Sequence, residues 1–220
     1  MDMMQAVYER HSVRSYIDRA VEKEKLDVLR KLIEECNADE ALNIQLVTNE
    51  PRAFSVFLTH YGLFDNIKNY IVLAGGGSDD IQEKCGYHGE RLVLTAQALG
   101  LNTCWVALTY KKVPGAFTLR EGDKLICVIA LGYGRTQGKA HRSKPLSAVI
   151  EGGNHPEWFI RGAECALLAP TAVNQQKFRF VREGSKVRAV CGLGACAKID
   201  LGIVKYHFEL GAGKENFEWM

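Results

Sequence analysis

The sequence contains no apolar run long enough to cross a lipid bilayer, which takes about 20 consecutive apolar residues in a helix. Its first residues, MDMMQAVYERHSVRSY, are too polar for a secretory signal peptide. It also lacks an excess of charge of either sign, because 28 Lys and Arg face 26 Asp and Glu, for a net charge of +2. We therefore expect a cytoplasmic protein whose partners are neither nucleic acids nor membranes.

Two common cofactor and metal motifs are missing as well. No GxGxxG occurs, so we expect no Rossmann-type nicotinamide site. No CxxC occurs either, and the seven cysteines are scattered as reduced, mostly buried thiols would be. Cys191 and Cys196 in CGLGAC lack ligand spacing and a nearby histidine. We interpret them as incidental small residues in a Gly-rich turn and expect no metal site.

What the chain does contain is an alternation of helical patterns with apolar, strand-like runs. Helices are expected over residues 3–9, 23–36 and 81–99, the second from apolar residues at helical spacing. The strand-like runs are ALNIQLVTN, NYIVLAGGG, NTCWVALTY and KLICVIALGYG, and the last predicts a strand buried on both faces. Residues 52–68 are mixed in character and predict a loop with a short helix. This alternation predicts an α/β or α+β layered sheet.

A polar, basic segment with Gly and Pro at residues 134–156 separates these elements from a second group. There, PEWFIRGAECALLAP predicts a helix, KFRFVREGSKVRAVCG a strand pair, and AKIDLGIVKYHFELGAG a final helix. The order echoes part of the first group, and the helix ends TAQALGL and HFELGAG are similar. We interpret this as an internal duplication, with a first half over residues 1–145 and a shorter second half over residues 146–220.

The stretch RHSVRSY gathers Arg10, His11, Ser12 and Arg14 within five positions. Short charged runs are usually surface, here the solvated turn of a helix. The alternative is a site for a small anion such as a cofactor phosphate, because guanidinium groups give phosphate bidentate, charge-assisted hydrogen bonds. From these residues alone, both interpretations stay open.

A second unusual segment is APTAVNQQKFRF, residues 169–180. Its proline cannot continue a helix, and Thr and Asn are common turn residues, so a plain helix-to-strand turn is one interpretation. The row of neutral amides and a hydroxyl after the proline also suits a polar heterocycle, which needs both donors and acceptors. The chemistry of the segment favours neither.

Together, RHSVRSY, APTAVNQQKFRF, ALGLNTCWVAL and the apolar strand ending in LGYG resemble the motif set of the nitroreductase family. The resemblance covers most of the chain. It implies an α+β fold in which helices flank a layered sheet, with FMN as cofactor and NAD(P)H as a transient electron donor. It also favours the anion interpretation of residues 10–14.

The resemblance implies a set of flavin-binding residues in this sequence. The opening Arg-x-Ser-x-Arg motif would hold the phosphate, ribityl chain and pyrimidine edge through Arg10, His11, Ser12 and Arg14. The late basic pair near the phosphate would be Arg142 and Lys144, whereas Lys139 fits a solvated loop nearly as well. Backbone amides facing flavin N5 and O4 would come from Val106, Ala107 and Leu108. The neighbouring Trp105 is interpreted as a core residue.

The family's Pro-Ser/Thr-x-x-Asn motif, which lies against the flavin from the other half of a dimer, is matched by Pro170, Thr171, Ala172 and Asn174. In most of the family this motif follows soon after the opening Arg motif, whereas here Pro170 comes 160 residues after Arg10. The chain therefore resembles a variant branch in which two degenerate halves share one chain. We expect a monomeric pseudo-dimer or a homodimer.

A further departure is that Ala107 and Leu108 replace a glycine pair often found at this place in the family. The main expectation is an FMN-dependent oxidoreductase that passes a hydride from NAD(P)H to a nitroaromatic, quinone or similar small acceptor. No catalytic side chain is expected, because the flavin performs the chemistry. The departures keep two alternatives open: a flavin-binding carrier or sensor with little turnover, and a relic that binds no flavin.

Overall fold

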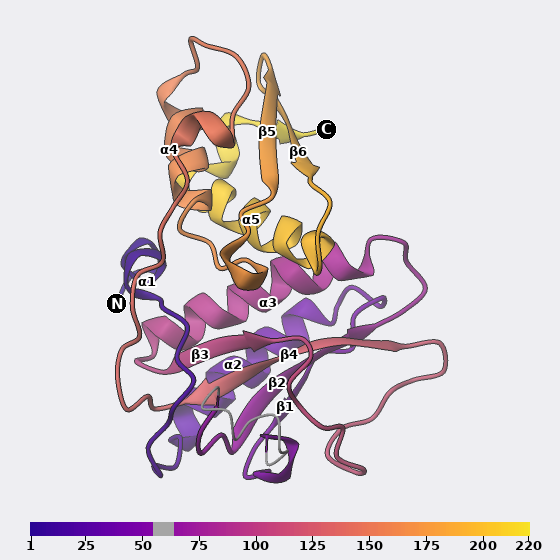
Figure 1. Ribbon diagram of the computed structural model, residues 1–220. Helices are drawn as coiled ribbons and strands as arrows, with labels where there is room; N and C mark the ends of the chain where they lie inside the picture. Colours follow the sequence, from indigo (N-terminus) through magenta and orange to yellow (C-terminus); the bar gives the residue numbers. More distant parts are fainter. Residues whose placement is uncertain (55–63) are drawn as a thin grey trace. The chain divides into compact units, whose positions relative to one another are not determined.

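A computed structural model describes residues 1–54 and 64–220 of the chain. The chain divides into two compact units, and Figure 1 labels helices α1–α5 and strands β1–β6. The first unit comprises residues 1–81 and 92–140, and the second comprises residues 82–91 and 141–220. The long helix α3 (Ile81–Ala98) thus contributes its N-terminal half to the second unit and the rest to the first.

The first unit is built on a four-stranded antiparallel sheet with the order β1-β2-β4-β3. Its remaining elements in chain order are α1 (Met3–Glu9), α2 (Lys23–Cys36), β1 (Gln45–Val47), the 3-10 turn η1 (Arg52–Phe54), β2 (Asn69–Gly75), β3 (Asn102–Val106) and β4 (Lys124–Gly132). The predicted helices and the four strand-like runs are confirmed. The expected loop with a short helix over residues 52–68 is described only at its ends, because residues 55–63 lie outside the described residues.

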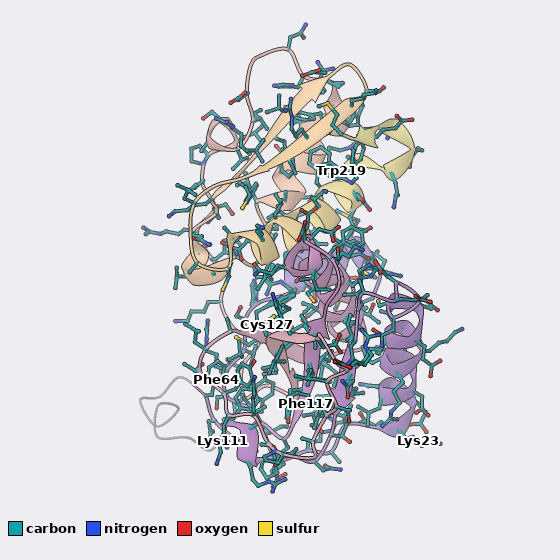
Figure 2. All side chains as sticks on the ribbon, turned by 90° about the vertical axis from the view of Figure 1, so that its right-hand side faces the viewer. Lys23, Phe64, Lys111, Phe117, Cys127 and Trp219 are labelled. Atoms are coloured by element: carbon teal, nitrogen blue, oxygen red, sulfur yellow. The ribbon has the colours of Figure 1, made fainter. Side chains whose placement is uncertain are left out.

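The sheet of the first unit is buried on both faces. Every residue of β2 is buried, and so is β4 from Cys127 onward, as its apolar sequence predicts. Because side chains alternate along a strand, Tyr70 and Val72 join a core cluster on one face, while Ile71 and Leu73 point to the other. Phe64 and Phe117, labelled in Figure 2, pack against that cluster. The sheet is therefore the rigid support for the loops at its ends.

The second unit combines two packed helices with a small sheet. Its elements are the 3-10 turn η3 (Leu146–Ala148), α4 (Glu157–Ala166), the 3-10 turn η4 (Ala172–Asn174), β5 (Phe178–Glu183), β6 (Lys186–Cys191), α5 (Ala197–Ala212), the 3-10 turn η5 (Lys214–Asn216) and β7 (Glu218–Trp219). The predicted helix, strand pair and helix are confirmed. Strand β7, which pairs in parallel with β6, was not predicted, because a two-residue strand has no periodicity of its own. The protein is thus of the α+β class.

Aromatic rings fill the interior of the second unit. Phe180 of β5 and Phe208 of α5 lie 4.4 Å apart between ring centroids, and both are fully buried. Phe159 of α4 and Phe217 also contact Phe208, at centroid distances of 5.6 and 5.2 Å. Trp219, labelled in Figure 2, closes this cluster at 5.5 Å from Phe208. These rings meet in tilted and edge-to-face arrangements, and each buries a large apolar surface.

A buried polar chain links the three helical segments of the second unit. His207 of α5 and Glu90 of α3 are both 0% exposed, and His207 Nε2 lies 2.9 Å from Glu90 Oε1. The other ring nitrogen of His207, Nδ1, lies 3.2 Å from the carbonyl oxygen of Cys165 in α4. A carbonyl can only accept, so Nδ1 carries a proton, and a second proton lies between Nε2 and the Glu90 carboxyl group. Every ring nitrogen is therefore satisfied without water.

All seven cysteines are free thiols, five of them buried and Cys191 and Cys196 half-buried. Among the described residues, no group of three His, Cys, Asp or Glu side chains is arranged to hold a metal ion. Within residues 1–54 and 64–220, none of the helices combines the length and the apolar composition that crossing a membrane would need.

Glycines allow a close helix crossing in the second unit. A Cβ on Gly202 of α5 would overlap the carbonyl oxygen of Glu83 in α3, and a Cβ on Gly86 would overlap the carbonyl oxygen of Ile199. Both obstacles are backbone atoms of helices, which cannot rotate away as a side chain can. The two helices can approach this closely only because neither position carries a side chain.

We predict that Gly202→Ala lowers the free energy of unfolding by about 1–3 kcal/mol through overpacking at this crossing. The loss should appear although alanine favours a helix over glycine by about 1 kcal/mol. Urea unfolding measures the effect. Gly153→Ala is the control, because a Cβ there would meet no atom within 4 Å. Equal stability of the two variants would contradict the close crossing.

Candidate functional site

The RHSVRSY segment is an extended strand-like stretch, not a helical turn. Helix α1 ends at Glu9, and Arg10 is extended and only 4% exposed. Ser12 forms a parallel bridge with Thr103 of β3, and the Val13 amide donates to the Thr103 carbonyl oxygen at 2.9 Å. The interpretation as a solvated turn of a surface helix is therefore wrong. The segment instead covers the edge of β3 that does not pair with β4.

Further backbone bonds hold the end of this segment between two loops of the first unit. The Asp65 amide donates to the Arg14 carbonyl oxygen at 2.9 Å, and the Tyr16 amide donates to the Asp65 carbonyl oxygen at 3.1 Å. On the other side, the Arg135 amide donates to the Ser15 carbonyl oxygen at 2.9 Å. Tyr16 is 2% exposed, and its hydroxyl donates to the Val13 carbonyl oxygen at 2.7 Å. The backbone of residues 12–16 is thus fixed from both sides.

Three side chains of the segment share surroundings around the buried thiol of Cys104. In extended backbone, alternate residues point to the same side, which groups Arg10, Ser12 and Arg14. Burial raises the pKa of the Cys104 thiol, while Arg14, a hydrogen bond with Ser12, and Arg10 act in the opposite direction. All three are therefore within electrostatic or hydrogen-bonding reach of one sulfur atom. Two guanidinium groups and a hydroxyl gathered in this way form a donor set suited to an anion.

His11 points away from that set and contacts a different loop. Its Nδ1 lies 3.2 Å from the carbonyl oxygen of Gln137. Because the carbonyl accepts, Nδ1 carries the proton, and Nε2 can donate only when the ring is a cation. The neighbouring Gly138 has a φ of +75°, and a Cβ there would lie 2.7 Å from the Cβ of His11. Glycine is therefore required for this approach.

The predicted residues that follow β3 lie at its C-terminal end. Val106 is the last strand residue and is 3% exposed, whereas Ala107 and Leu108 begin a bend. The side chain of Leu108 is 87% exposed. Trp105 is half-buried, so its assignment as a core residue holds only in part.

In the second unit, the predicted loop after α4 is organised by a buried carboxylate. Asp200, in the first turn of α5, is 6% exposed and accepts hydrogen bonds from the Ala172 amide at 3.0 Å and from Gln175 Nε2 at 2.7 Å. Burial raises the pKa of Asp200 to about 6 from its ordinary value of 3.8, although the two hydrogen bonds oppose that rise. The carboxylate thus fixes the start of the 172–176 loop.

The same loop is bonded to the basic segment at residues 142–144. Asn174 Nδ2 donates to the Arg142 carbonyl oxygen at 3.0 Å, and Gln176 Nε2 donates to the same oxygen at 2.8 Å. Lys144 Nζ donates to the carbonyl oxygens of Gln175 and Gln176 at 2.8 and 2.9 Å. The structure therefore brings Arg142 and Lys144 together with the Pro-Thr-x-x-Asn segment in one hydrogen-bonded junction.

This junction holds strained backbone. Val173 has a φ of 45°, and Asn174 and Gln176 have φ values of 55° and 44°. A left-handed conformation is a genuine outlier for a β-branched residue and costs roughly 1–3 kcal/mol. The Val173 side chain is 97% exposed, so no packing favours this conformation. The polar bonds of Asp200, Lys144 and Gln176 must offset the strain.

The predicted site residues fall into two groups. The first unit holds two sets: Arg10, Ser12 and Arg14, with His11 on the same segment, and Val106, Ala107 and Leu108 at the end of β3. Those brought together in the second unit are Arg142, Lys144, Pro170, Thr171, Ala172 and Asn174. Each group belongs to one unit.

Two residues outside the predicted site hold the second group in place: Gln176, which belongs to the row of neutral amides after Pro170, and Asp200. Gln176 is 3% exposed. Its backbone amide donates to the Thr171 hydroxyl oxygen at 3.0 Å, and its Nε2 donates to Asn174 Oδ1 at 2.8 Å. Asp200 was overlooked because it lies within a helical pattern. The available signal was an acid between Ile199 and Leu201 in an otherwise apolar helix start, which predicts a buried carboxylate with partners.

The chain matches a family model described as "Putative TM nitroreductase" over residues 2–212. No protein in a search of curated sequences matches it.

Solved structures show the same fold. A Thermotoga maritima protein described in similar terms has a TM-score of 0.70 at 22% identity, covering 98% of this chain and 85% of its own. A Desulfovibrio desulfuricans protein of like description, in complex with FMN, has a TM-score of 0.56 at 18% identity, covering 71% of this chain and 99% of its own. An FMN-dependent nitroreductase from Clostridium difficile has a TM-score of 0.50 at 22% identity, covering 62% of this chain and 90% of its own.

The raised pKa of Asp200 predicts a pH dependence of stability. A carboxyl group whose folded-state pKa of about 6 exceeds its ordinary 3.8 favours folding most when protonated. Asp200 therefore contributes fully to the free energy of unfolding below about pH 4. This contribution, of up to about 2–3 kcal/mol, is lost as the pH rises through 6.

Urea unfolding of wild type and Asp200→Asn between pH 4 and 7 measures this contribution. The difference in free energy of unfolding between the two proteins should change with pH in that range, with wild type losing more as the pH rises. Asp27→Asn, at a half-exposed surface ion pair, is the control and should show no such change. A pH-independent difference for Asp200→Asn would contradict the assignment.

Proposed function

This chain belongs to the nitroreductase family, and we propose that it is an FMN-dependent oxidoreductase. In this proposal a hydride passes from NAD(P)H, through the flavin, to a small acceptor such as a nitroaromatic compound or a quinone. The single observation that carries the proposal is the convergence of Arg10, Ser12 and Arg14 on a fixed segment beside β3 in a chain of this family.

The donor chemistry of that segment fits the phosphate of FMN. Phosphate accepts charge-assisted hydrogen bonds, and Arg10 and Arg14 supply two guanidinium groups that stay charged at any working pH. Ser12 adds a hydroxyl, whereas His11 is bonded to the Gln137 carbonyl oxygen on the other side of the segment. The backbone is fixed before any ligand binds, so little ordering entropy opposes binding.

The second group of residues supports the proposal with fewer free donors. Both ends of the Asn174 amide are engaged, with Arg142 and with Gln176, so we assign it to holding the loop. The Thr171 hydroxyl accepts from the Gln176 amide and can still donate its own proton. Lys144 keeps one N–H of its ammonium after its two carbonyl bonds. We propose that Thr171, Lys144 and the Arg142 guanidinium are the ligand-binding groups of this loop.

Bound FMN would supply the hydride-transfer chemistry, and the chain would supply position and electrostatics. Positive charge from Arg14 beside the flavin would favour the reduced cofactor as an anion. Backbone amides after Val106 would orient the ring, and the exposed Leu108 would lie on the side that a substrate approaches. The described side chains need not move a proton for this reaction.

The visible absorption spectrum of the purified protein, recorded before and after heat denaturation, tests the cofactor assignment. We expect the two bands of oxidised flavin, released into the supernatant by heat, with a mass equal to that of FMN. A colourless protein that cannot be reconstituted with FMN would overturn the proposal and favour a protein that no longer binds flavin.

We predict that Arg14→Ala weakens FMN binding by roughly 10- to 150-fold, the range for loss of one charge-assisted hydrogen bond of about 1.5–3 kcal/mol. Quenching of flavin fluorescence on titration into the apoprotein measures the affinity. Arg30→Ala is the control, since Arg30 is a surface guanidinium on α2 paired with Asp27. Unaltered FMN binding by Arg14→Ala would show that the opening motif is wrongly assigned.

One observation favours a second candidate, a flavin-binding carrier or sensor with little turnover. Leu108, which stands where the family often has a glycine, exposes 87% of its surface and would narrow the space over a bound ring. Steady oxidation of NADH or NADPH in the presence of a quinone separates the two. Turnover supports the oxidoreductase, and tight FMN binding without turnover supports the carrier.

We also propose that the protein acts in the cytoplasm. A separate proposal is that one chain carries both sets of flavin-binding residues. Light scattering together with the FMN content per chain tests this arrangement. One FMN per chain in a monomer fits a pseudo-dimer within a single chain. A dimer with the same stoichiometry fits a homodimer.

A further inference from the structure

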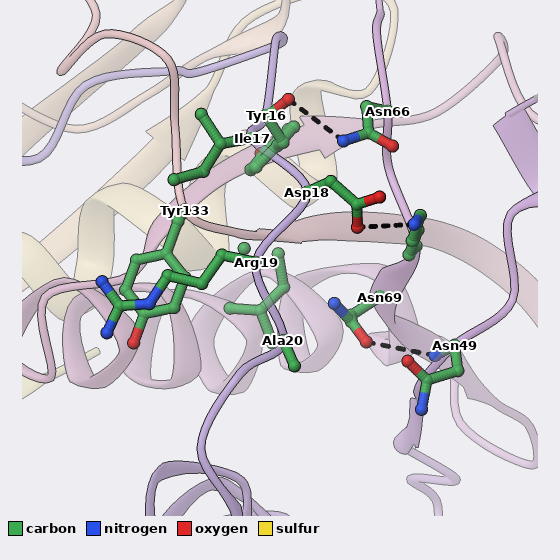
Figure 3. A pocket seen from close by; sticks show the side chains of 12 residues that line it. Tyr16, Ile17, Asp18, Arg19, Ala20, Asn49, Asn66, Asn69 and Tyr133 are labelled. Atoms are coloured by element: carbon green, nitrogen blue, oxygen red, sulfur yellow. Dashed lines mark hydrogen bonds and ion pairs between the residues drawn. The ribbon is translucent and has the colours of Figure 1, made fainter.

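A small polar pocket in the first unit is lined by none of the residues proposed to bind flavin. Its volume is about 90 Å³, and it lies between the loop that follows Tyr16, the start of β2 and the end of β4. We propose that it binds a small carboxylate anion. Figure 3 shows the side chains that line it.

The most informative lining residue is Asn69, the first residue of β2. It is 9% exposed, and its Oδ1 accepts a hydrogen bond from the Asn49 amide at 3.1 Å. Among the described residues, its Nδ2 has no hydrogen-bond partner. This nitrogen is not among the fully buried polar atoms that lack a partner, so solvent reaches it, and Asn69 offers a donor at the wall of the pocket (Figure 3).

Two further asparagines surround the same space. Asn49 and Asn66 have φ values of 56° and 54°, a conformation that asparagine tolerates better than most residues. Turn geometry therefore explains why asparagine occupies these two positions, whereas Asn69, which lies in a strand, holds the turn at Asn49 through its Oδ1 and keeps its Nδ2 for another acceptor. Asn66 Nδ2 donates to the Tyr16 carbonyl oxygen at 3.3 Å. The side chain of Asn49 is exposed to solvent and can also donate through its amide nitrogen. The pocket thus presents at least two amide groups able to donate.

Charge gives the pocket its preference for an anion. Its lining includes two cations, Arg19 and Lys68, against one anion, Asp18. Arg19 is engaged, since its guanidinium stacks 4.0 Å from the Tyr133 ring centroid and donates to Glu22 at 2.6 Å. Lys68 Nζ donates to Asp18 at 2.6 Å, which uses one of the three N–H bonds of the ammonium. Lys68 can therefore bind an incoming anion without leaving Asp18.

Size and donor geometry together indicate a carboxylate. A volume of 90 Å³ is about three times the share of one water molecule in the liquid, which admits only a few non-hydrogen atoms. A carboxylate has two oxygens, of which one can accept from the Lys68 ammonium and the other from the amide nitrogen of Asn69. A ligand this small makes few contacts, so we expect affinity in the millimolar range.

Titration of isotopically labelled protein with sodium acetate, followed by NMR, tests the proposal. We expect saturable shifts of the backbone amide signals of Asn49 and Gly132, with sodium chloride at equal ionic strength as the reference. Acetamide, which has the shape of acetate without its charge, should bind at least tenfold more weakly. Equal binding of acetamide, or equal shifts with chloride, would overturn the assignment to a carboxylate.

Lys68→Met should weaken acetate binding at least tenfold through the loss of its charge, whereas Lys112→Met, at an exposed lysine of the same unit, should not change it. The absence of saturable shifts, or equal affinity of Lys68→Met and wild type, would overturn the proposal. The titration is run on both the apoprotein and the FMN-saturated protein. Acetate binding does not require flavin, so its failure would leave the proposed function untouched.

Discussion

The pairing of residues 12–16 with β3 and its neighbouring loops is the constraint on which both sites of the first unit depend. The bond from the Val13 amide to Thr103 sets the register of the segment against the sheet, and the burial of Tyr16 fixes its end. Before Tyr16, the segment presents Arg10, Ser12 and Arg14 to one side. After Tyr16, it forms one wall of the asparagine-lined pocket. One strip of backbone therefore positions an anion-binding donor set and a separate polar pocket.

In the second unit, charged side chains fix the 172–176 loop and so position its binding groups. Asp200 accepts from the loop backbone, Lys144 donates to it, and Gln176 joins the loop to residue 142. Most polar groups of this segment are thereby engaged with one another. Such bracing offsets the left-handed conformation of Val173 and keeps the loop in one shape. It also divides the roles within the motif, since Asn174 holds the loop whereas Thr171 keeps a proton to donate.

Close packing holds the helices of that unit together. Gly86 and Gly202 let α3 and α5 approach, and the Glu90–His207 pair joins them with all ring nitrogens satisfied. Polar groups this deeply buried disfavour other packing arrangements, because leaving one partner unpaired in the interior would be costly. The aromatic cluster around Phe208 supplies the apolar burial.

The sequence by itself determined the helices, the main strands, the α+β class and the family, because periodicity and motif spacing are local properties of the chain. Helix 23–36 and the strand KLICVIALGYG follow from their apolar patterns alone. Strand β7 escaped prediction because two residues carry no period. Only the tertiary structure decided that Arg10 is buried, that Asp200 braces the 172–176 loop, and that Asn49, Asn66 and Asn69 share a pocket. Burial and long-range hydrogen bonds depend on which segments meet in space, and no spacing along the chain encodes that meeting.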